Sequence, residues 1–372
     1  MWNQLRNTFN QKKVLVTGHT GFKGAWLTQT LHLLGAEIMG YSLAPYYENN
    51  LYDLLDLEYL CKESIIGDIE EEKKLVDKIL AFQPDFIFHL AAQPLVRLSY
   101  KDPVATYRSN VMGTVHVLDA IRQLNKPVTS VLITTDKVYE NNESGTSFLE
   151  DDKLGGYDPY SSSKACCEIA ISSYMRSFFN PKEYKEHGKA TASCRAGNVI
   201  GGGDWATDRL LPDIIRALKQ DEVIDIRSPH AIRPWQHVIE PVFFYLLLAM
   251  KLEQNPIQYA GAWNIGPDKQ DILTVQEVVE KALVIWGSGK YESKVNTNAP
   301  HEAGILKLDC AKAKSILGWR PQLNADTAIA KTIEWYKVND QDPTKSQAFT
   351  IQQIMEYADS LDTVSTVQTV GE

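Results

Sequence analysis

Tyr160 and Lys164 are two ionisable residues spaced four positions apart, in a Tyr-x-x-x-Lys pattern. On a helix, positions i and i+4 share one face, so the Lys164 ammonium is expected beside the Tyr160 phenol. A neighbouring positive charge lowers the phenol pKa from about 10, which would let Tyr160 take a proton from a hydroxyl group. Thr135 and Asp136 stand at the end of a predicted strand that precedes this pattern, and they are expected in the same site.

A glycine-rich turn stands near the start of the chain. Gly18, Gly21 and Gly24 occur in the order Gly-His-Thr-Gly-Phe-Lys-Gly, after a predicted strand and before a predicted helix. Glycines at this spacing let the backbone turn tightly and approach a pyrophosphate, whose negative charge is favoured at a helix N-terminus. The pattern therefore predicts a dinucleotide-binding turn. The other candidate cofactor contacts of this turn are Thr20, Phe22 and Lys23.

Further candidate cofactor contacts follow the next strands, and Tyr160 and Lys164 would also touch the cofactor. The second predicted strand ends in Gly-Tyr-Ser-Leu at residues 40–43, without the acid or the arginine that separates NAD from NADP, so the pattern alone leaves that choice open. Small side chains after the fourth strand would let a cofactor lie close. These strand-end candidates are Asp68, Ile69, Ala91, Ala92 and Gln93.

Alternating strand-like and helix-like segments must position these residues. Short β-branched runs alternate with longer helical stretches through the first half of the chain, which indicates βαβ units and a parallel sheet. The predicted strands are Lys13–Thr17, Glu37–Tyr41, Glu63–Ile66, Asp85–Leu90, Thr129–Thr134 and Thr191–Cys194. The predicted crossover helices include Phe22–Leu34, Pro103–Leu124 and Tyr160–Phe179.

The pattern changes after about residue 195, where we expect a smaller domain that shares elements with the first. A glycine run at 201–203 begins this part, and we expect a weakly organised polar tail from Asp340. For the glycine run, a plain turn and a phosphate contact both remain open. The further predicted elements are helices Asp208–Gln220, Val238–Leu252 and Val275–Trp286, and strands Val223–Ile226 and Trp263–Ile265.

Composition narrows the class of protein. The chain has 372 residues, with 38 Lys and Arg against 47 Asp and Glu, and its net charge of −9 opposes nucleic-acid binding by bulk electrostatics. Its five cysteines form no CxxC pair or metal-ligand spacing, so we expect no metal and a reducing, cytoplasmic location. The longest apolar run, Val242–Met250, is too short to span a bilayer, so no membrane insertion is expected.

Together these segments resemble the extended short-chain dehydrogenase/reductase family of nucleotide-sugar enzymes, from Lys13 to about Pro321. The resemblance implies an α/β fold, a Rossmann-type doubly wound parallel sheet that binds NAD, with a smaller C-terminal α/β domain for a nucleotide sugar. It implies an NAD-binding domain at 1–195 plus about 230–262, a nucleotide-sugar domain at about 196–229 and 263–335, and a helical or polar tail at 336–372. It also implies substrate contacts at Asn198, Arg209, Leu210, Arg233 and His301.

Within that family, the Thr135-Asp136-Lys137 segment is similar to CDP-glucose 4,6-dehydratases, whereas dTDP-glucose enzymes carry Asp-Glu after the threonine. The implied reaction converts CDP-glucose into its 4-keto-6-deoxy derivative and water. It proceeds by oxidation at C4, elimination across C5 and C6, and hydride return to C6. Asp136 would protonate the departing hydroxyl, and Lys137 would either remove the C5 proton or stabilise the enolate as a cation.

Two other functions remain open at this point, and the resemblance also predicts an oligomer. A 4-epimerase of the same fold has small residues where this chain has Asp136 and Lys137. A non-catalytic NAD or nucleotide-sugar sensor has no reason to keep Thr135, Tyr160 and Lys164 together. The resemblance implies a homodimer, possibly a tetramer, formed through the helices at 103–124 and 160–179. The expected apolar contacts are Val111, Val115, Leu118 and Ile169.

Overall fold

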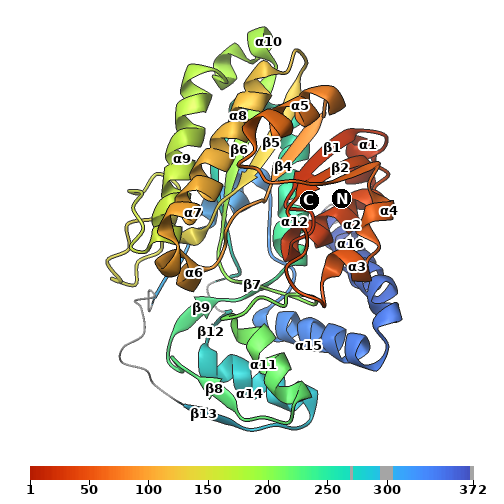
Figure 1. The fold of residues 1–372 in the computed structure, drawn as a ribbon, viewed down its shortest axis with the longest axis vertical. Coiled ribbons are helices and arrows are strands. Elements are labelled where there is room, and N and C mark those ends of the chain that lie inside the picture. The colour runs from red at the N-terminus through yellow and green to blue at the C-terminus, as the bar shows by residue number, and fades with distance from the viewer. Residues whose placement is uncertain (269–270, 294–304, 369–372) are drawn as a thin grey trace.

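The computed structural model describes residues 1–268, 271–293 and 305–368. A seven-stranded sheet with helices on both faces forms the larger part of the molecule, and a smaller lobe of short strands and helices adjoins one end of the sheet (Figure 1). Within the described residues, no helix combines the length and the apolar character that crossing a bilayer requires.

The central sheet is parallel throughout and has the strand order β11-β6-β5-β4-β1-β2-β3. Val14 and Val16 pack into one apolar core and Leu15, between them, packs into another, as expected for a strand covered on both faces. The fold is therefore the predicted doubly wound α/β arrangement. The strands are β1 Lys13–Thr17, β2 Glu37–Ser42, β3 Glu63–Ile66, β4 Phe86–His89, β5 Val128–Ile133, β6 Lys189–Ala196 and β11 Gly261–Ile265.

Helices cover both faces of this sheet (Figure 1). One face packs against α1 Trp2–Phe9, α2 Phe22–Leu33, α12 Ile239–Gln254 and α16 Ser346–Gln368. The other face packs against α5 Glu72–Phe82, α8 Gly113–Gln123 and α9 Pro159–Ser177. Shorter elements connect them: α3 Leu51–Leu54, α4 Leu57–Leu60, α6 Val96–Lys101, α7 Pro103–Tyr107, η1 Arg108–Met112, η2 Asp136–Val138, η3 Pro181–Glu183, α10 Tyr184–His187, α13 Pro256–Tyr259, η4 Ala313–Leu317 and η5 Pro343–Lys345.

The smaller lobe contains three two-stranded sheets, β7 with β10, β8 with β13 and β9 with β12. It follows the carboxyl ends of β6 and β11, the edge of a parallel sheet where ligands bind in open α/β folds. Its strands are β7 Val199–Ile200, β8 Ile224–Ile226, β9 Ile232–Pro234, β10 Gln236–His237, β12 Ile272–Thr274 and β13 Tyr291–Ser293. Its helices are α11 Leu210–Lys219, α14 Val275–Trp286 and α15 Ala325–Gln341.

The structure corrects two expectations about the second half. Strand β11 pairs with β6 in the main sheet, so the domain boundary expected between residues 262 and 263 falls inside a strand of the larger part. The tail expected at 336–372 as helical or polar contains the 23-residue helix α16, so the weak organisation expected from Asp340 is wrong. The α16 residues Ile354, Tyr357, Ala358 and Leu361 recur at helical spacing and are buried in the main core, which explains why this mostly polar segment is helical.

The expected helix at 103–124 is also more divided than its periodicity suggests. It consists of α7, the π-helical turn η1 and α8. Of the four residues expected to make intersubunit contacts, Leu118 is fully buried against the sheet and cannot meet a second subunit, whereas Ile169 is 56 % exposed. The helical period predicts that Val115 and Leu118 lie on one surface of the helix. In the structure Leu118 is buried against the sheet, whereas Val115 is only partly buried.

Candidate active site

The glycine-rich turn joins β1 to α2 with very little space around its backbone. Gly18 has a φ of +78°, and a Cβ added there would lie 2.7 Å from the Ala91 backbone nitrogen. A Cβ on Gly24 would lie 2.0 Å from the Gly18 carbonyl oxygen. Gly21 is the N-cap residue of α2, and no side chain among the described residues caps this helix. The first backbone N–H groups of α2 therefore remain available to an anion, and the turn fits a dinucleotide pyrophosphate.

Side chains of the same turn differ in what they can offer a ligand. The Thr20 hydroxyl bonds the Ser42 hydroxyl at 2.8 Å and donates to the Leu43 carbonyl at 2.9 Å, so it ties the turn to the end of β2. Phe22 packs beside Gly201, where an added Cβ would lie 3.1 Å from its ring. Burial, together with the nearby charges of Arg209 and Lys164, lowers the Lys23 pKa to about 8. Lys23 therefore lies among the charged groups of the site.

The candidates after β3 and β4 line the same edge of the sheet. Asp68 accepts a hydrogen bond from the Glu70 backbone through Oδ1 at 2.9 Å, and Ile69 is buried against Gly113. Ala91 lies directly under the glycine turn. The Gln93 side chain donates to the Thr106 hydroxyl at 2.9 Å and accepts from the Leu95 backbone, so it shapes its own loop. Ala92, between them, is partly exposed.

Asn110 is a structural residue of the site that sequence reasoning missed. It lies in the π-helical turn, accepts a hydrogen bond from the Gln93 backbone at 2.8 Å and donates to the Ser163 hydroxyl at 2.8 Å. It thereby links the loop after β4 to the helix that carries Tyr160. A π-helical turn often marks a functional position, but the sequence carries no periodic signal for a single one.

Tyr160 meets Thr135 and Asp136 where β5 ends and α9 begins. Asp158 caps α9 by accepting from the Ser161 backbone at 2.9 Å, which places Tyr160 in the first turn. The Thr135 side chain is close enough to the Tyr160 hydroxyl to lower the Tyr160 pKa. Thr135 Oγ1 donates to Asp136 Oδ1 at 3.0 Å. A chain of neighbouring side chains therefore runs from the phenol to the carboxyl group.

The Asp136 carboxyl group is buried, and one of its two oxygens makes no hydrogen bond with the described residues. The residue is 2 % exposed, and its Oδ2 has no hydrogen-bond partner within the part of the chain that the structure describes. Lys137 Nζ lies 4.0 Å from the other oxygen, Oδ1. An unpartnered buried carboxyl oxygen is costly, so this atom is expected to meet a polar group of a ligand.

The electrostatics of Tyr160 differ from the expectation. Burial, with a smaller contribution from Asp136, raises the Tyr160 pKa to about 12, although the Thr135 side chain and Arg209 act in the opposite direction. The Lys164 ammonium donates to the Ile133 carbonyl at 3.3 Å, and burial lowers the Lys164 pKa. The expected lowering of the Tyr160 pKa by Lys164 is therefore wrong for the protein alone, because the low-polarity surroundings disfavour the phenolate more than the positive charges favour it.

Two of the expected substrate contacts, Asn198 and Arg209, lie near the catalytic residues. Asn198 follows Gly197, and a Cβ on Gly197 would lie 3.2 Å from Asp136 Oδ2. Arg209 precedes Leu210, the first residue of α11, and its guanidinium donates to Asp204 at 2.7 Å. Asp204, which sequence reasoning missed, thus holds the side chain of a candidate diphosphate ligand.

Of the two remaining expected substrate contacts, the structure describes Arg233 but not His301. Arg233 lies on β9 and donates to the Ile232 carbonyl at 2.9 Å. His301 lies outside the described residues. The glycine run at 201–203 serves packing, because a Cβ on Gly202 would lie 2.0 Å from the Trp335 ring and one on Gly203 would lie 2.3 Å from Leu51.

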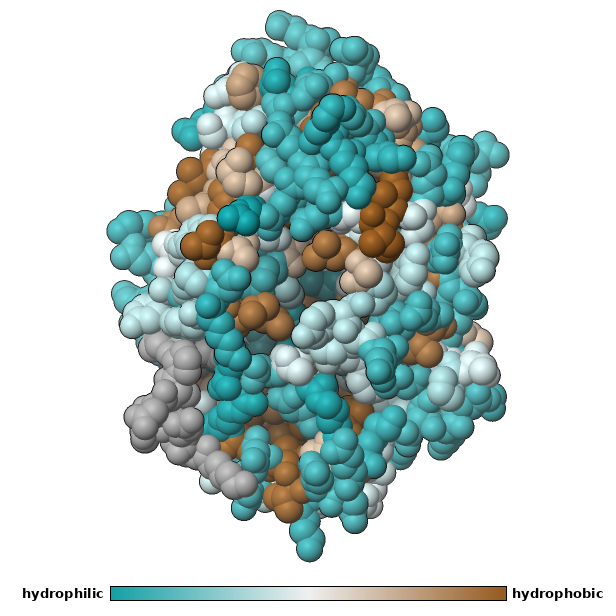
Figure 2. Space-filling model, viewed as in Figure 1, coloured by the Kyte–Doolittle hydropathy of each residue, from teal (hydrophilic) through white to brown (hydrophobic). Residues whose placement is uncertain are grey.

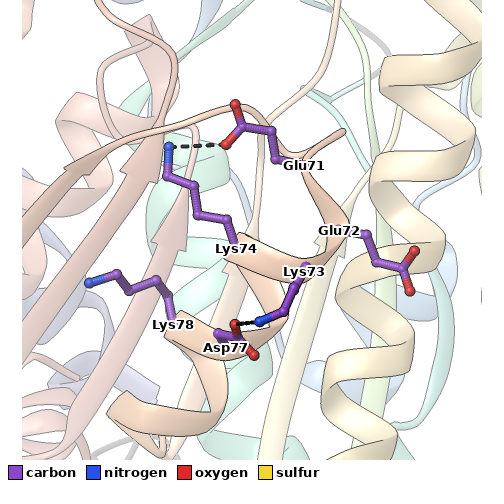
Figure 3. A pocket seen from close by; sticks show the side chains of 6 residues that line it. All are labelled: Glu71, Glu72, Lys73, Lys74, Asp77 and Lys78. Carbon is purple, nitrogen blue, oxygen red and sulfur yellow. Dashed lines mark hydrogen bonds and ion pairs between the residues drawn. The ribbon is translucent and has the colours of Figure 1, made fainter.

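The surface is hollowed between the larger part of the molecule and the smaller lobe, as Figure 2 shows. A separate surface hollow of about 590 Å³ lies over the first turns of α5 (Figure 3). Two of its lysines pair with acids of the same hollow, with Lys73 Nζ 2.6 Å from Asp77 and Lys74 Nζ 3.0 Å from Glu71. These exposed helical ion pairs are typical of a solvated face, and we assign the chemistry to the strand ends instead.

Several known proteins are similar to this chain over most of its length. A CDP-glucose 4,6-dehydratase from Salmonella typhimurium is 46% identical over 332 residues, which cover 89% of this chain and 92% of the relative. Two solved structures share the fold. An epimerase from Methanothermobacter thermautotrophicus has a TM-score of 0.76 at 20% identity and covers 93% of this chain and 97% of its own. A dTDP-glucose 4,6-dehydratase from Bacillus anthracis in complex with NAD has a TM-score of 0.72 at 20% identity and covers 89% and 98%.

The family model described as GDP-mannose 4,6 dehydratase matches residues 15–332, from β1 into α15. This span contains the glycine turn, the Thr135-Asp136-Lys137 segment, the Tyr160 helix and the arginines of the smaller lobe. Given the sheet topology, the buried Tyr160–Thr135–Asp136 chain and this match over most of its length, the chain belongs to the GDP-mannose 4,6 dehydratase family.

Proposed function

We propose that this chain catalyses the NAD-dependent 4,6-dehydration of CDP-glucose to CDP-4-keto-6-deoxyglucose and water. The 46% identity to a CDP-glucose 4,6-dehydratase over 89% of the chain supports both the reaction and the nucleotide. The site supports the reaction independently, because it holds a phenol, a hydroxyl, a carboxyl group and an amine where the sheet opens toward the smaller lobe.

The single observation that carries the proposal is the buried carboxyl group of Asp136. A 4-epimerase oxidises and reduces one carbon and expels no hydroxyl group, so it has no need of an acid. A dehydratase must protonate the departing O6. Asp136 is 2 % exposed, is joined to Tyr160 through Thr135, and presents an unpartnered oxygen within the described site. These are the properties required of a general acid.

Tyr160 starts the reaction by taking the proton of the sugar C4 hydroxyl, with the Thr135 side chain beside it. When bound, NAD supplies the ring that accepts the hydride from C4 and returns it to C6. Since burial raises the Tyr160 pKa to about 12, the phenolate forms only with added positive charge in the site. Arg209 already contributes in that direction.

The elimination uses the pair that follows Thr135. The C4 ketone acidifies the C5 hydrogen, and Asp136 donates its proton to O6 as the C6–O6 bond breaks. Lys137 lies 4.0 Å from Asp136 and is placed either to remove the C5 proton or to stabilise the enolate as a cation. The 4.0 Å distance between Lys137 and Asp136 fits both roles, and the Lys137→Ala variant distinguishes them.

Backbone and charged groups of the strand ends would hold the cofactor and the substrate. The N–H groups at the start of α2 suit the NAD pyrophosphate, and the small residues after β4 leave room for the ring. Arg209, Arg233 and Asn198 suit the diphosphate of the nucleotide sugar, because a guanidinium grips phosphate oxygens in pairs. The nucleotide then supplies the binding energy that orients the sugar.

We also propose that the protein works as a homodimer in the cytoplasm. Val104, Met112 and Ile169, on α7, η1 and α9, are exposed apolar side chains on the helices expected to meet a second copy. Five free cysteines, three of them buried, suit a reducing compartment. Sedimentation tests the first claim: a Val104→Glu/Ile169→Glu variant should shift to the monomer, and a wild-type monomer at micromolar concentration would contradict it.

The proposed function is tested by incubating the protein and NAD with CDP-, dTDP-, UDP- and GDP-glucose in parallel. We expect a 4-keto-6-deoxy product, detected by mass and by its absorbance in alkali, with CDP-glucose turned over fastest. A 4-epimer as the only product would identify an epimerase. Bound NAD without turnover of any of the four sugars would identify a sensor.

A further inference from the structure

A buried network of charged and polar side chains lies directly behind the catalytic residues. Glu168, on α9, and Arg195, at the end of β6, are 3 % and 4 % exposed and form an ion pair with an Nη2–Oε2 distance of 2.7 Å. Glu168 also accepts hydrogen bonds from the Thr134 and Ser193 hydroxyl groups. We call Glu168, Arg195, Tyr139 and Asn264 the Glu168 network.

The network holds the catalytic segment at both of its ends. Thr134, bonded to Glu168, immediately precedes Thr135. Tyr139, whose hydroxyl accepts a 2.8 Å hydrogen bond from Arg195 Nη1, lies two residues after Lys137. The short turn η2, Asp136–Val138, lies between these anchors with Thr135 as its N-cap residue, so its position depends on the two bonds.

The network also holds the helix that carries the other catalytic residues. Glu168 follows Lys164 by four residues on α9, so the two share one helix face. The ion pair to Arg195 therefore fixes α9, with Tyr160 and Lys164, relative to β6 and to the segment at 134–139. Tyr160 and Thr135, whose side chains are close enough for Thr135 to lower the Tyr160 pKa, belong to the two segments that this pair holds together.

Two further bonds extend the network to the loop above the site. The Tyr139 hydroxyl donates to Asn264 Oδ1 at 2.7 Å, and Asn264 Nδ2 donates to the Phe148 carbonyl at 2.9 Å. Arg195 Nη1 also donates to the Glu150 carbonyl at 2.7 Å. The long loop between η2 and α9 is thus tied to the same buried charges.

Stability alone does not account for this arrangement. Burying an ion pair costs desolvation that its attraction barely repays, and apolar replacements of similar volume are often as stable. Catalysis has a stricter requirement, because a displacement of about 1 Å between reacting groups can lower a rate about 100-fold. A buried pair that joins the two halves of a catalytic site meets that requirement.

We propose that Glu168 and Arg195 are positioning residues that hold the Thr135-Asp136-Lys137 segment against Tyr160 and Lys164. The expected loss of rate rests on the proposed dehydratase function. The positioning of the Thr135-Asp136-Lys137 segment by Glu168 and Arg195 does not depend on a substrate. Neither residue touches the reacting atoms. Both act through Thr134 and Tyr139.

Glu168→Gln removes the charge and weakens the bonds to Arg195 and Thr134. We expect kcat to fall about 10- to 100-fold while KM for CDP-glucose changes less than about threefold, because the diphosphate contacts lie elsewhere. Glu240→Gln is the matched control. Glu240 is also a carboxyl group, 1 % exposed, with three hydrogen bonds to Gln322, Leu323 and Tyr357, but it joins α12 to α16 away from the site. This control should keep wild-type kcat.

Glu168→Gln leaves Arg195 as a buried cation without its acidic partner, so a second variant removes both charges. Glu168→Met/Arg195→Met replaces both charges with flexible apolar side chains, so the fold is expected to persist. Its kcat should remain at least 10-fold below that of the wild type even where its melting temperature matches. Wild-type kcat in this folded double variant would overturn the proposal.

Hydrogen exchange in the NAD-loaded protein without substrate completes the test. We expect faster exchange of the amides at 134–139 in both Glu168 variants than in the wild type and in Glu240→Gln. Unchanged exchange there in both variants would overturn the proposal. If the wild type converts no nucleotide sugar, the proposed function fails by itself, and the exchange comparison still decides whether the network holds this segment.

Discussion

Replacing Asp136 with asparagine keeps the size and shape of the side chain and removes its capacity to transfer a proton. Asp136 Oδ1 accepts from the Thr135 hydroxyl at 3.0 Å, and the amide oxygen of asparagine can accept the same bond. Oδ2 has no hydrogen-bond partner among the described residues, so the amide nitrogen that replaces it breaks no bond within them. Among the described residues, the 4.0 Å contact with Lys137 is the one ion pair that is lost. We therefore expect Asp136→Asn to fold like the wild type.

The kinetic effect should be large by comparison. A positioned general acid contributes about 100- to 10,000-fold, which corresponds to roughly 3–5 kcal/mol of transition-state stabilisation. Because Asp136 is 2 % exposed, bulk water has little access to protonate O6 in its place. We expect kcat to fall within that range and KM to change by no more than a few-fold, since the nucleotide contacts are intact.

The assay separates the steps of the reaction. In heavy water, Asp136→Asn should still oxidise C4 and exchange the C5 hydrogen, while loss of the C6 hydroxyl becomes very slow. Asp119→Asn is the control, because Asp119 bonds Arg122 on the outer side of α8 and should leave every step unchanged. A folded Asp136→Asn enzyme with kcat within threefold of the wild type would refute the role of Asp136 as the acid.

Three further changes probe other groups. Tyr160→Phe should abolish C4 oxidation and C5 exchange while CDP-glucose still binds by calorimetry, and normal turnover would move the first base elsewhere. Lys137→Ala should lose C5 exchange with C4 oxidation intact if Lys137 removes the proton, and full exchange with normal product would exclude it from the reaction. Burial raises the Glu240 pKa from 4.5 to about 7, so its contribution to stability is complete below about pH 4.5 and lost as pH rises through about 7. Wild-type protein should therefore lose about 3 kcal/mol of unfolding free energy from this group between pH 4.5 and 8, and urea unfolding of Glu240→Gln should lack this loss; equal pH dependence would contradict the assignment.

Much of the fold could be predicted because its signals are local. Strand β1 has the predicted bounds, Lys13–Thr17, since a short β-branched run before a glycine turn allows few alternatives. Helix α14 likewise begins at Val275 and ends at Trp286 as predicted, and a Thr274–Glu277 capping box marks its start. The predicted parallel sheet follows from the alternation of such segments.

Features that depend on tertiary contacts could not be predicted. The stripe of Ile354, Tyr357, Ala358 and Leu361 in α16 is diluted by polar residues, and its burial depends on α1 and α15 being in place. The direction of the Tyr160 pKa shift depends on how deeply the phenol is buried, which a Tyr-x-x-x-Lys spacing does not specify. The Glu168–Arg195 pair joins residues 27 positions apart, and neither stands in a recognisable pattern.

The central claim is that one catalytic site both oxidises C4 and returns the same hydride to C6. The most direct test is turnover of CDP-glucose carrying deuterium at C4, with NAD bound to the protein and NADH followed by absorbance. We expect the deuterium at C6 of the 4-keto-6-deoxy product and no accumulation of NADH. Loss of the deuterium to solvent, or NADH formed in amounts equal to product, would contradict the proposed reaction.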